Sequence, residues 1–261
     1  FLLYILKTFK NPHVPLKHME APQQPPKIDP AKEKAFKKKI DQLKDKILKD
    51  YKKQTIGIAL LPPKIIRPED VKYMTKEDIE KEKEKISVLV VLDDSKSEKT
   101  PDYKIKDKIS PELVKIAKSI DEKIWLEVSL ISEIRESLFD GKYELLQVIA
   151  MSAILHDPTD FLAALKISEV HKNMTIKKFE KYIVSYIGAG TLFRGEKSND
   201  IDVYIVIDDT DVRRMSRAEL KEKLRGLIQA MAIEASAITG VKKQFHVQTY
   251  ILTDFWESIK D

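Results

Sequence analysis

Cysteine is absent from the 261-residue chain, and its absence excludes two kinds of structure. Without a thiol the protein has no disulfide framework and no thiolate-ligated metal centre. Any metal site must therefore use carboxylate, imidazole or other oxygen ligands. A chain without disulfides also suits a reducing compartment, and we expect a cytoplasmic protein.

Long apolar runs are equally scarce. The chain opens on an apolar stretch, Phe1–Lys10, of about ten residues, against the roughly 20 that a membrane helix needs. No basic segment precedes it and no small-residue cleavage site follows it, so it does not resemble a signal peptide. We expect no membrane contact, and we expect this stretch to pack on the protein itself or on a neighbour, as a docking strand or a tail. Six prolines between positions 11 and 30 favour an extended linker, and we assign residues 1–30 to an extended N-terminal segment.

Neither sign of charge dominates. The chain has 47 basic and 42 acidic residues and a net charge of +5, which permits contact with nucleotide or nucleic acid but does not require it. The 43% apolar content is typical of a globular protein with a substantial core.

Apolar residues recur with helical and strand periods along the rest of the chain. The run Ile86–Asp94 is typical of a buried strand, whereas Phe36, Ile40 and Leu43 follow helical spacing. The alternation of the two patterns predicts an α/β (α+β) fold. In chain order we predict a helix at 31–53, a strand at 86–94, a helix opened by Ser110-Pro111, a strand at 124–130, helices at 132–155 and 160–184, a strand at 200–207, a helix opened by Ser216 and a strand at 245–252.

The second half of the chain repeats the first. Ile124–Asp140 aligns without gaps on Phe245–Asp261, an offset of 121 (245 − 124), and most apolar positions stay apolar. Two shorter matches have offsets of 115 (209 − 94) and 131 (182 − 51), so we interpret the differences as changes in loop length. These matches are Val90–Asp94 with Ile205–Asp209, and Tyr51…Gly57 with Tyr182…Gly188.

We therefore expect two tandem domains of one fold, each a small mixed sheet with flanking helices. The first spans residues 31–158 and the second residues 159–261. The first copy continues past Asp140 for almost twenty more residues, and nothing corresponding follows Asp261, so we expect the second copy to be incomplete at its C-terminal end. The alternative is a chance likeness between generic α/β units.

The residues that carry chemistry lie at the start of the strand predicted at 200–207. Side chains alternate between the faces of a strand, so Asp200 and Asp202 should point the same way with their Cα atoms about 6–7 Å apart. Two carboxylates at that separation can share hard divalent cations that bridge to substrate phosphates. Upstream, Gly190-Thr191 forms a turn whose backbone amides are free to approach a phosphate. A solvated strand start is the alternative for an Asp-x-Asp pattern taken alone.

This run resembles the signature of polymerase-beta-like nucleotidyltransferases, in which a Gly-Ser or Gly-Gly turn precedes an Asp-hydrophobic-Asp-hydrophobic strand. Residues 180–261 are especially similar to small archaeal nucleotidyltransferase-domain proteins. The resemblance implies a nucleoside triphosphate as substrate, gripped by Gly190 and Thr191. It also implies two Mg²⁺ ions held by Asp200 and Asp202 as the catalytic pair, and a third carboxylate on a later strand.

The sequence departs from this signature in three respects. Thr191 replaces the usual serine but keeps the hydroxyl, and only eight residues separate it from Asp200. The position expected for the third carboxylate holds Gln248, whose amide cannot accept a proton as a general base. Asp208 is no substitute, because it lies about 20 Å further along the strand than Asp202.

The first copy lacks the metal-binding pattern. Lys85 and Ser87 stand where the aspartates should be, and its turn, Gly57–Leu60, has no Gly-Thr pair. Glu127 occupies the position of Gln248, so a composite site that borrows Glu127 is one alternative. We interpret the first copy as a degenerate structural or recognition domain.

Several other side chains are weaker candidates. Arg194 and Lys197, in the loop between turn and strand, could clamp phosphates, although loop cations are usually only solvated. Lys242 and Lys243 could face nucleic acid or form an ordinary charged turn. His246 could touch the site or serve as a hydrogen-bonded structural residue.

Two functions follow as expectations. The first is Mg²⁺-dependent transfer of a nucleoside monophosphate from a triphosphate to a hydroxyl on RNA, protein or a small molecule. The alternative is an inactive nucleotidyltransferase-fold module, a pseudoenzyme that binds RNA, a ribosomal surface or a protein partner, because fold alone does not determine function.

Overall fold

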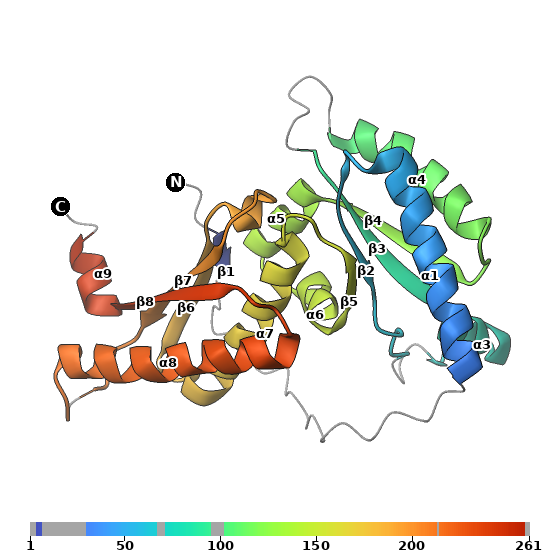
Figure 1. The fold of residues 1–261 in the computed structure, drawn as a ribbon. Helices are drawn as coiled ribbons and strands as arrows, with labels where there is room; N and C mark the ends of the chain where they lie inside the picture. Colours follow the sequence, from blue (N-terminus) through green and yellow to red (C-terminus); the bar gives the residue numbers. More distant parts are fainter. Residues whose placement is uncertain (1–3, 7–29, 67–70, 95–101, 213, 259–261) are drawn as a thin grey trace.

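A computed structural model describes residues 4–6, 30–66, 71–94, 102–212 and 214–258, which form two four-stranded mixed sheets with flanking helices (Figure 1). The strands are β1 (Tyr4–Leu6), β2 (Thr55–Leu60), β3 (Ile86–Leu92), β4 (Ile124–Leu130), β5 (Ala153–His156), β6 (Ile183–Ala189), β7 (Asp200–Ile207) and β8 (Gln244–Ile251). The helices are α1 (Pro30–Tyr51), α3 (Lys76–Glu84), α4 (Asp102–Lys118), α5 (Ile131–Phe139), α6 (Glu144–Met151), α7 (Phe161–Phe179), α8 (Arg217–Thr239) and α9 (Leu252–Ser258), with a 3₁₀ turn η1 at Leu192–Arg194. The predicted α/β (α+β) class is confirmed.

The two sheets differ in how they are covered. In the first, of order β4-β3-β2-β5, the five residues Val88–Leu92 of β3 are all buried, because helices pack on both faces. In the second, of order β1-β6-β7-β8, β8 alternates between exposed and buried residues along its whole length. One face of the second sheet is therefore packed against the core and the other reaches solvent.

Strand pairing reproduces the repeat that the sequence predicts. The parallel pair β3–β4 aligns Ile86 with Ile124, and the parallel pair β7–β8 aligns Ile201 with Phe245. Equivalent residues of the two sheets therefore differ in number by 115 (201 − 86) in β3 and β7 and by 121 (245 − 124) in β4 and β8, which are the offsets read from the sequence. The equivalence extends to the ends of the strands, where Leu92 pairs with Leu130 in the first sheet and Ile207 pairs with Ile251 in the second.

The predicted offset between β2 and β6 is wrong by three residues. Both strands carry a register shift against their neighbour, between Thr55 and Gly57 in β2 and between Ile183 and Ser185 in β6. Aligning the two irregularities gives an offset of 128 (183 − 55), not 131. The pleat and its bulge set the register, whereas the shared Ile-Gly dipeptide that suggested 131 does not occupy equivalent places in the sheets.

Correcting the offset moves the turn of the first copy. The counterpart of Gly190 becomes Pro62 (190 − 128), at the end of β2, rather than a residue of Gly57–Leu60. Pro62 and Pro63 have no backbone N–H, so this turn offers no amides to a phosphate at those two positions.

The N-terminal strand β1 takes the place in the second sheet that β5 takes in the first. Strand β1 runs antiparallel to β6, with Leu6 opposite Tyr186, and β5 runs antiparallel to β2, the equivalent of β6, with His156 opposite Ile58. The expectation that the N-terminal segment packs as a strand is thus confirmed for residues 4–6. Of the predicted linker at 11–30, residues 11–29 lie outside the described residues, and Pro30 begins α1.

Three predicted helix boundaries are wrong. The helix expected to open at Ser110-Pro111 begins at Asp102, so proline lies inside α4. Ile109, Leu113 and Ala117 form a continuous buried stripe on α4, and that burial offsets the roughly 3 kcal/mol that an interior proline costs.

The two remaining errors concern helices predicted too long. The expected helix 132–155 is divided into α5, α6 and strand β5, with Gly141 at φ +74° between the two helices. The helix predicted at 160–184 ends at Phe179, and the chain continues as β6 from Ile183. Strand pairing explains both corrections, because β5 pairs with β2 at the edge of the first sheet and β6 pairs with β1 and β7 inside the second, and local apolar spacing does not report these pairings.

Helix α7 lies between the two sheets and joins their cores (Figure 1). Its residues Phe161, Leu162 and Leu165 belong to one hydrophobic cluster that also contains Leu89 of the first sheet and Val203 of the second. The boundary proposed at residue 158 stays a prediction, because this cluster crosses it.

A buried histidine on α7 links that helix to the second sheet. The Nδ1 atom of His171 lies 2.8 Å from the Tyr186 hydroxyl, and its Nε2 atom lies 3.0 Å from the Ile228 carbonyl oxygen. Because a carbonyl only accepts, Nε2 carries the proton and Nδ1 accepts from Tyr186. Burial lowers the pKa of His171 to about 4.

We expect His171 to make the fold sensitive to acid. Its pKa is lower in the folded state than in the unfolded chain, so below about pH 6.5 the unfolded state gains a proton that the folded state does not. This group should remove about 2 kcal/mol of stability between pH 6.5 and 5. Burial raises the pKa of Asp157 to about 6 and gives the opposite slope, so the effect must be measured as a difference between variants.

Denaturant unfolding of the wild type and of His171→Gln at pH 7 and pH 5 provides that difference. The stability gap between the two proteins should shrink by about 2 kcal/mol at pH 5, because only the wild type holds this imidazole neutral. Asp157 is present in both proteins and cancels. An unchanged gap would contradict the assignment.

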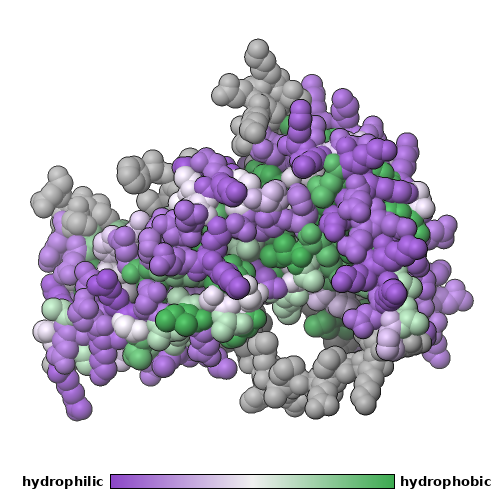
Figure 2. Space-filling view, in the orientation of Figure 1, coloured by the Kyte–Doolittle hydropathy of each residue, from purple (hydrophilic) through white to green (hydrophobic). Residues whose placement is uncertain are grey.

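The outer surface is mostly polar. The face in Figure 2 is predominantly hydrophilic, with smaller apolar areas between charged side chains. In the parts of the chain that the structure describes, no helix combines the length and apolarity that crossing a membrane requires.

Candidate metal and nucleotide site

Asp200 and Asp202 project from the open face of the second sheet. Along β7 the two aspartates are half-buried, while Ile201 and Val203 between and after them are fully buried in the core. The predicted alternation is confirmed. The apolar side chains anchor the strand, and the carboxylates remain accessible on the other face.

His246 completes a three-residue group with the two aspartates. The parallel register of β7 and β8 sets His246 beside Asp202. Its Nδ1 lies 3.3 Å from an oxygen of Asp200 and 3.6 Å from an oxygen of Asp202. One potential ligand atom from each residue lies within 4.8 Å of the other two, so the group could hold a metal ion.

The glycine turn lies against this group. Ala189 pairs with Asp202 across β6 and β7, and Gly190 follows with φ +102°, a conformation that side chains rarely tolerate. A Cβ at Gly190 would approach an oxygen of Asp202 to 3.2 Å. Thr191 follows as the N-cap of the turn η1. The structure thus brings Gly190 beside Asp202, and the role of Gly190 and Thr191 in gripping a triphosphate stays a prediction.

Gln248 does not act as a third acid. It pairs with Tyr204, two residues beyond the Asp202–His246 pair, and its side-chain oxygen accepts a hydrogen bond from Tyr250 (3.1 Å). The side chain that stands beside the aspartates on β8 is instead His246. From the sequence alone, His246 is only a weak candidate for the site.

Arg194 and Lys197 line a separate hollow. It has a volume of about 410 Å³, and its lining includes Asp93 and Arg135 from the first half of the chain but none of the three potential metal ligands. Arg194 also forms an ion pair with Glu196 (3.2 Å). The two cations therefore face the junction between the halves, and their role in gripping phosphate stays a prediction.

Lys243 has a structural role in this region. Its ammonium group contacts Asp160 (2.8 Å) and donates to the Ser198 carbonyl oxygen (2.5 Å), with only 15% of its side chain exposed. It ties the start of β8 to the loop before β7 and to the start of α7. These contacts favour the ordinary charged turn over a nucleic-acid contact at Lys243.

The equivalent positions of the first sheet hold a lysine, a tryptophan and a serine, and the lysine, Lys85, also forms an ion pair with Glu82. Lys85, the counterpart of Asp200, lies over the ring of Trp125 at 4.6 Å, and Trp125 is the counterpart of His246 (246 − 121). Ser87 replaces Asp202. These three residues offer no carboxylate, and Glu127 is not part of the group around Asp200. The interpretation that the first copy cannot hold the metal pair agrees with this arrangement.

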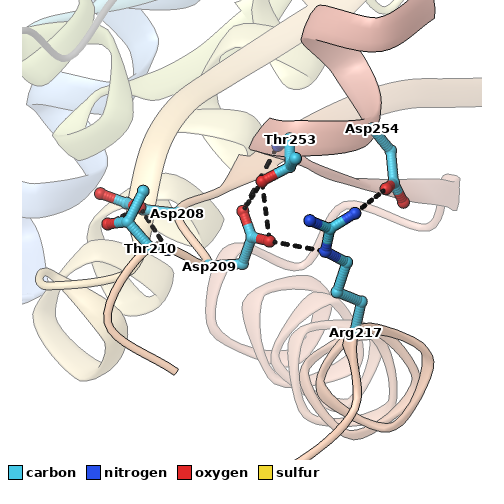
Figure 3. Close-up of polar contacts among 6 residues, drawn as sticks. All are labelled: Asp208, Asp209, Thr210, Arg217, Thr253 and Asp254. Carbon is cyan, nitrogen blue, oxygen red and sulfur yellow. Dashed lines mark hydrogen bonds and ion pairs between the residues drawn. The ribbon is translucent and has the colours of Figure 1, made fainter. Parts of the chain in front are cut away.

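A second polar cluster lies at the other end of β7 and β8 (Figure 3). Asp209 is nearly buried and accepts hydrogen bonds from the Thr253 amide (3.3 Å) and hydroxyl (2.7 Å), at the start of α9. Arg217 bridges Asp209 (3.2 Å) and Asp254 (3.4 Å), and Asp208 accepts from Thr210. The carboxylates here are already satisfied by their neighbours.

The first half contains the same arrangement, which indicates a structural role. Asp94, the counterpart of Asp209, accepts from the amide (3.3 Å) and the hydroxyl of Ser132, the counterpart of Thr253, at the start of α5. In both halves a carboxylate after the central strand caps the helix that follows the next strand. The helix cap is therefore present in both halves, whereas the acidic pair is present only in the second.

Comparison with known proteins identifies no relative: no family model matches the chain, and no curated protein is significantly similar to it.

Proposed function

We propose that the second half of the chain is a divalent-metal-dependent nucleotidyltransferase. The observation that supports this function best is the approach of Asp200, Asp202 and His246 to one another on an open sheet face directly beside Gly190. Carboxylates next to a glycine turn suit a metal-bound polyphosphate, because the backbone amides of such a turn can bind phosphate. The resemblance of this segment to polymerase-beta-like enzymes supports the same function and implies Mg²⁺.

Each residue has a distinct task in this proposal. Asp200 and Asp202 would hold the metal, which would supply positive charge to the phosphates, and Gly190 and Thr191 would receive the triphosphate. An acceptor hydroxyl on RNA, protein or a small molecule attacks the α-phosphorus. The new P–O bond forms as the bond to the β-phosphate breaks, and pyrophosphate leaves. Because Gln248 cannot accept a proton, the hydroxyl proton must pass to water or to another base than Gln248.

A second function is favoured by the same residue, Gln248. Without a carboxylate at that position the site lacks the expected general base, and its neighbour Tyr250 holds the amide oxygen. A module that binds nucleotide, RNA or a protein partner without transferring anything therefore remains the alternative proposal.

Calorimetry with ATP or CTP and Mg²⁺ tests the binding step. The wild type should bind in a metal-dependent manner, and Asp200→Ala/Asp202→Ala should lose this binding because no carboxylate pair remains to hold the metal. Asp208→Ala is the matched control: it removes a carboxylate from the far end of the same segment and should bind as the wild type does. Absence of metal-dependent binding in the wild type would reject the nucleotide site.

A further inference from the structure

The third ligand on the open sheet face is an imidazole, and this restricts the metals that fit. Bonds of roughly 2.0–2.2 Å place neighbouring ligand atoms of one ion about 3 Å apart. The Nδ1 atom of His246 lies 3.3 Å and 3.6 Å from the carboxylate oxygens of Asp200 and Asp202, close to that spacing. The imidazole nitrogen can therefore share an ion with either carboxylate after a small adjustment, and one ligand atom from each of the three residues lies within 4.8 Å of the others.

The site is also accessible enough to exchange ions and to admit a phosphate. The side chains of Asp200 and Asp202 are 37% and 35% exposed, and that of His246 is 51% exposed. Ser198 donates a hydrogen bond to the other oxygen of Asp200 (2.8 Å), which leaves the oxygen nearest His246 to the metal. Such a hydrogen bond fixes the orientation of a ligating carboxylate.

Ligand chemistry separates Mg²⁺ from the transition metals here. Mg²⁺ binds through oxygen, keeps several waters and gains little from nitrogen. Imidazole adds affinity for Mn²⁺ and for the heavier first-row dications, whose affinity increases along the series from Mn²⁺.

We infer that Asp200, Asp202 and His246 form one mixed oxygen–nitrogen site that selects a first-row transition-metal dication over Mg²⁺. This inference uses the residues of the proposed function and refines it by naming the metal, but it requires metal binding alone. Mn²⁺ is the most demanding probe, because it is the weakest binder of its series.

Electron paramagnetic resonance measures Mn²⁺ binding directly, because the six-line spectrum of the free ion is lost when the ion binds. We expect one tightly bound Mn²⁺ per chain, and we expect Mg²⁺ to displace it only at a concentration at least about tenfold higher. In His246→Gln the Mn²⁺ affinity should fall about tenfold or more, while the Mg²⁺ affinity, measured by calorimetry, should change less than twofold.

Two variants separate the site from its surroundings. Gln244→Ala removes a neutral side chain on the same strand and face and should bind Mn²⁺ as the wild type does, whereas Asp202→Asn should weaken both metals. Equal affinity of the wild type for Mn²⁺ and Mg²⁺, or an equal loss of both in His246→Gln, would overturn the inference. If the protein selects Mn²⁺ but binds no nucleotide, the proposed function is rejected and this inference stands. If it binds nucleotide with Mg²⁺ but does not prefer Mn²⁺, this inference is rejected and the proposed function stands.

Discussion

Asp202→Asn is expected to reduce nucleotidyl transfer by a factor of about a hundred to a thousand. Asp202 is the residue that contacts both parts of the proposed site, since it approaches His246 on one side and Gly190 on the other. Asparagine keeps its size and removes its charge, so a metal would lose an anionic ligand while the strand keeps its shape. The measurement is incorporation of label from an α-labelled triphosphate into cellular RNA or protein.

The fold should not change in this variant. Asp202 is partly exposed and lies near another carboxylate, so its replacement should alter stability by no more than about 0.5 kcal/mol. Asp208→Asn is the control for removal of a carboxylate from the same segment. Transfer at the wild-type rate in Asp202→Asn would contradict the assignment. A wild type that binds triphosphate but never transfers it would favour the non-catalytic module.

The part of this site that lies along one segment could be predicted from the sequence. Alternation places Asp200 and Asp202 on one face, and the short loop after Gly190 brings the turn back toward them. His246 could not be found in that way. Its position depends on which strand pairs with β7 and on the register of that pair, and both are set by packing far along the chain.

The repeat illustrates the same limit in another form. The offsets for the parallel strands are correct because they rest on longer ungapped matches, the 17 residues Ile124–Asp140 and the five residues Val90–Asp94. The offset for β2 and β6 is wrong because it rests on one tyrosine and one Ile-Gly dipeptide. The glycines serve different contacts: Leu162 packs over Gly57, and Phe193 packs over Gly188. A short identical dipeptide is therefore poorer evidence of equivalence than a shared bulge.

A buried ion pair on α7 should have the largest effect on stability. Lys172 contacts Glu169 at 2.5 Å one turn away, and the two side chains are only 5% and 0% exposed. Asn173 donates to the other oxygen of Glu169 (3.1 Å), and the Lys172 ammonium group lies 4.6 Å from the centre of the Tyr143 ring. Both charges are almost entirely buried, so each depends on the other for compensation.

Lys172→Met should therefore destabilise the fold by about 3–5 kcal/mol, because it leaves the Glu169 carboxylate buried without its counter-charge. The measurement is the free energy of unfolding in urea, with Lys177→Met as the control at an exposed position of the same helix. Lys172→Met/Glu169→Gln should recover most of the loss, since both charges are then gone and the coupling energy appears in the double-mutant cycle. Additive losses would show that packing around the lysine chain, and not the missing charge, determines the cost. Because α7 carries residues of the core shared by both sheets, the destabilised variant should unfold in a single transition and not one half at a time.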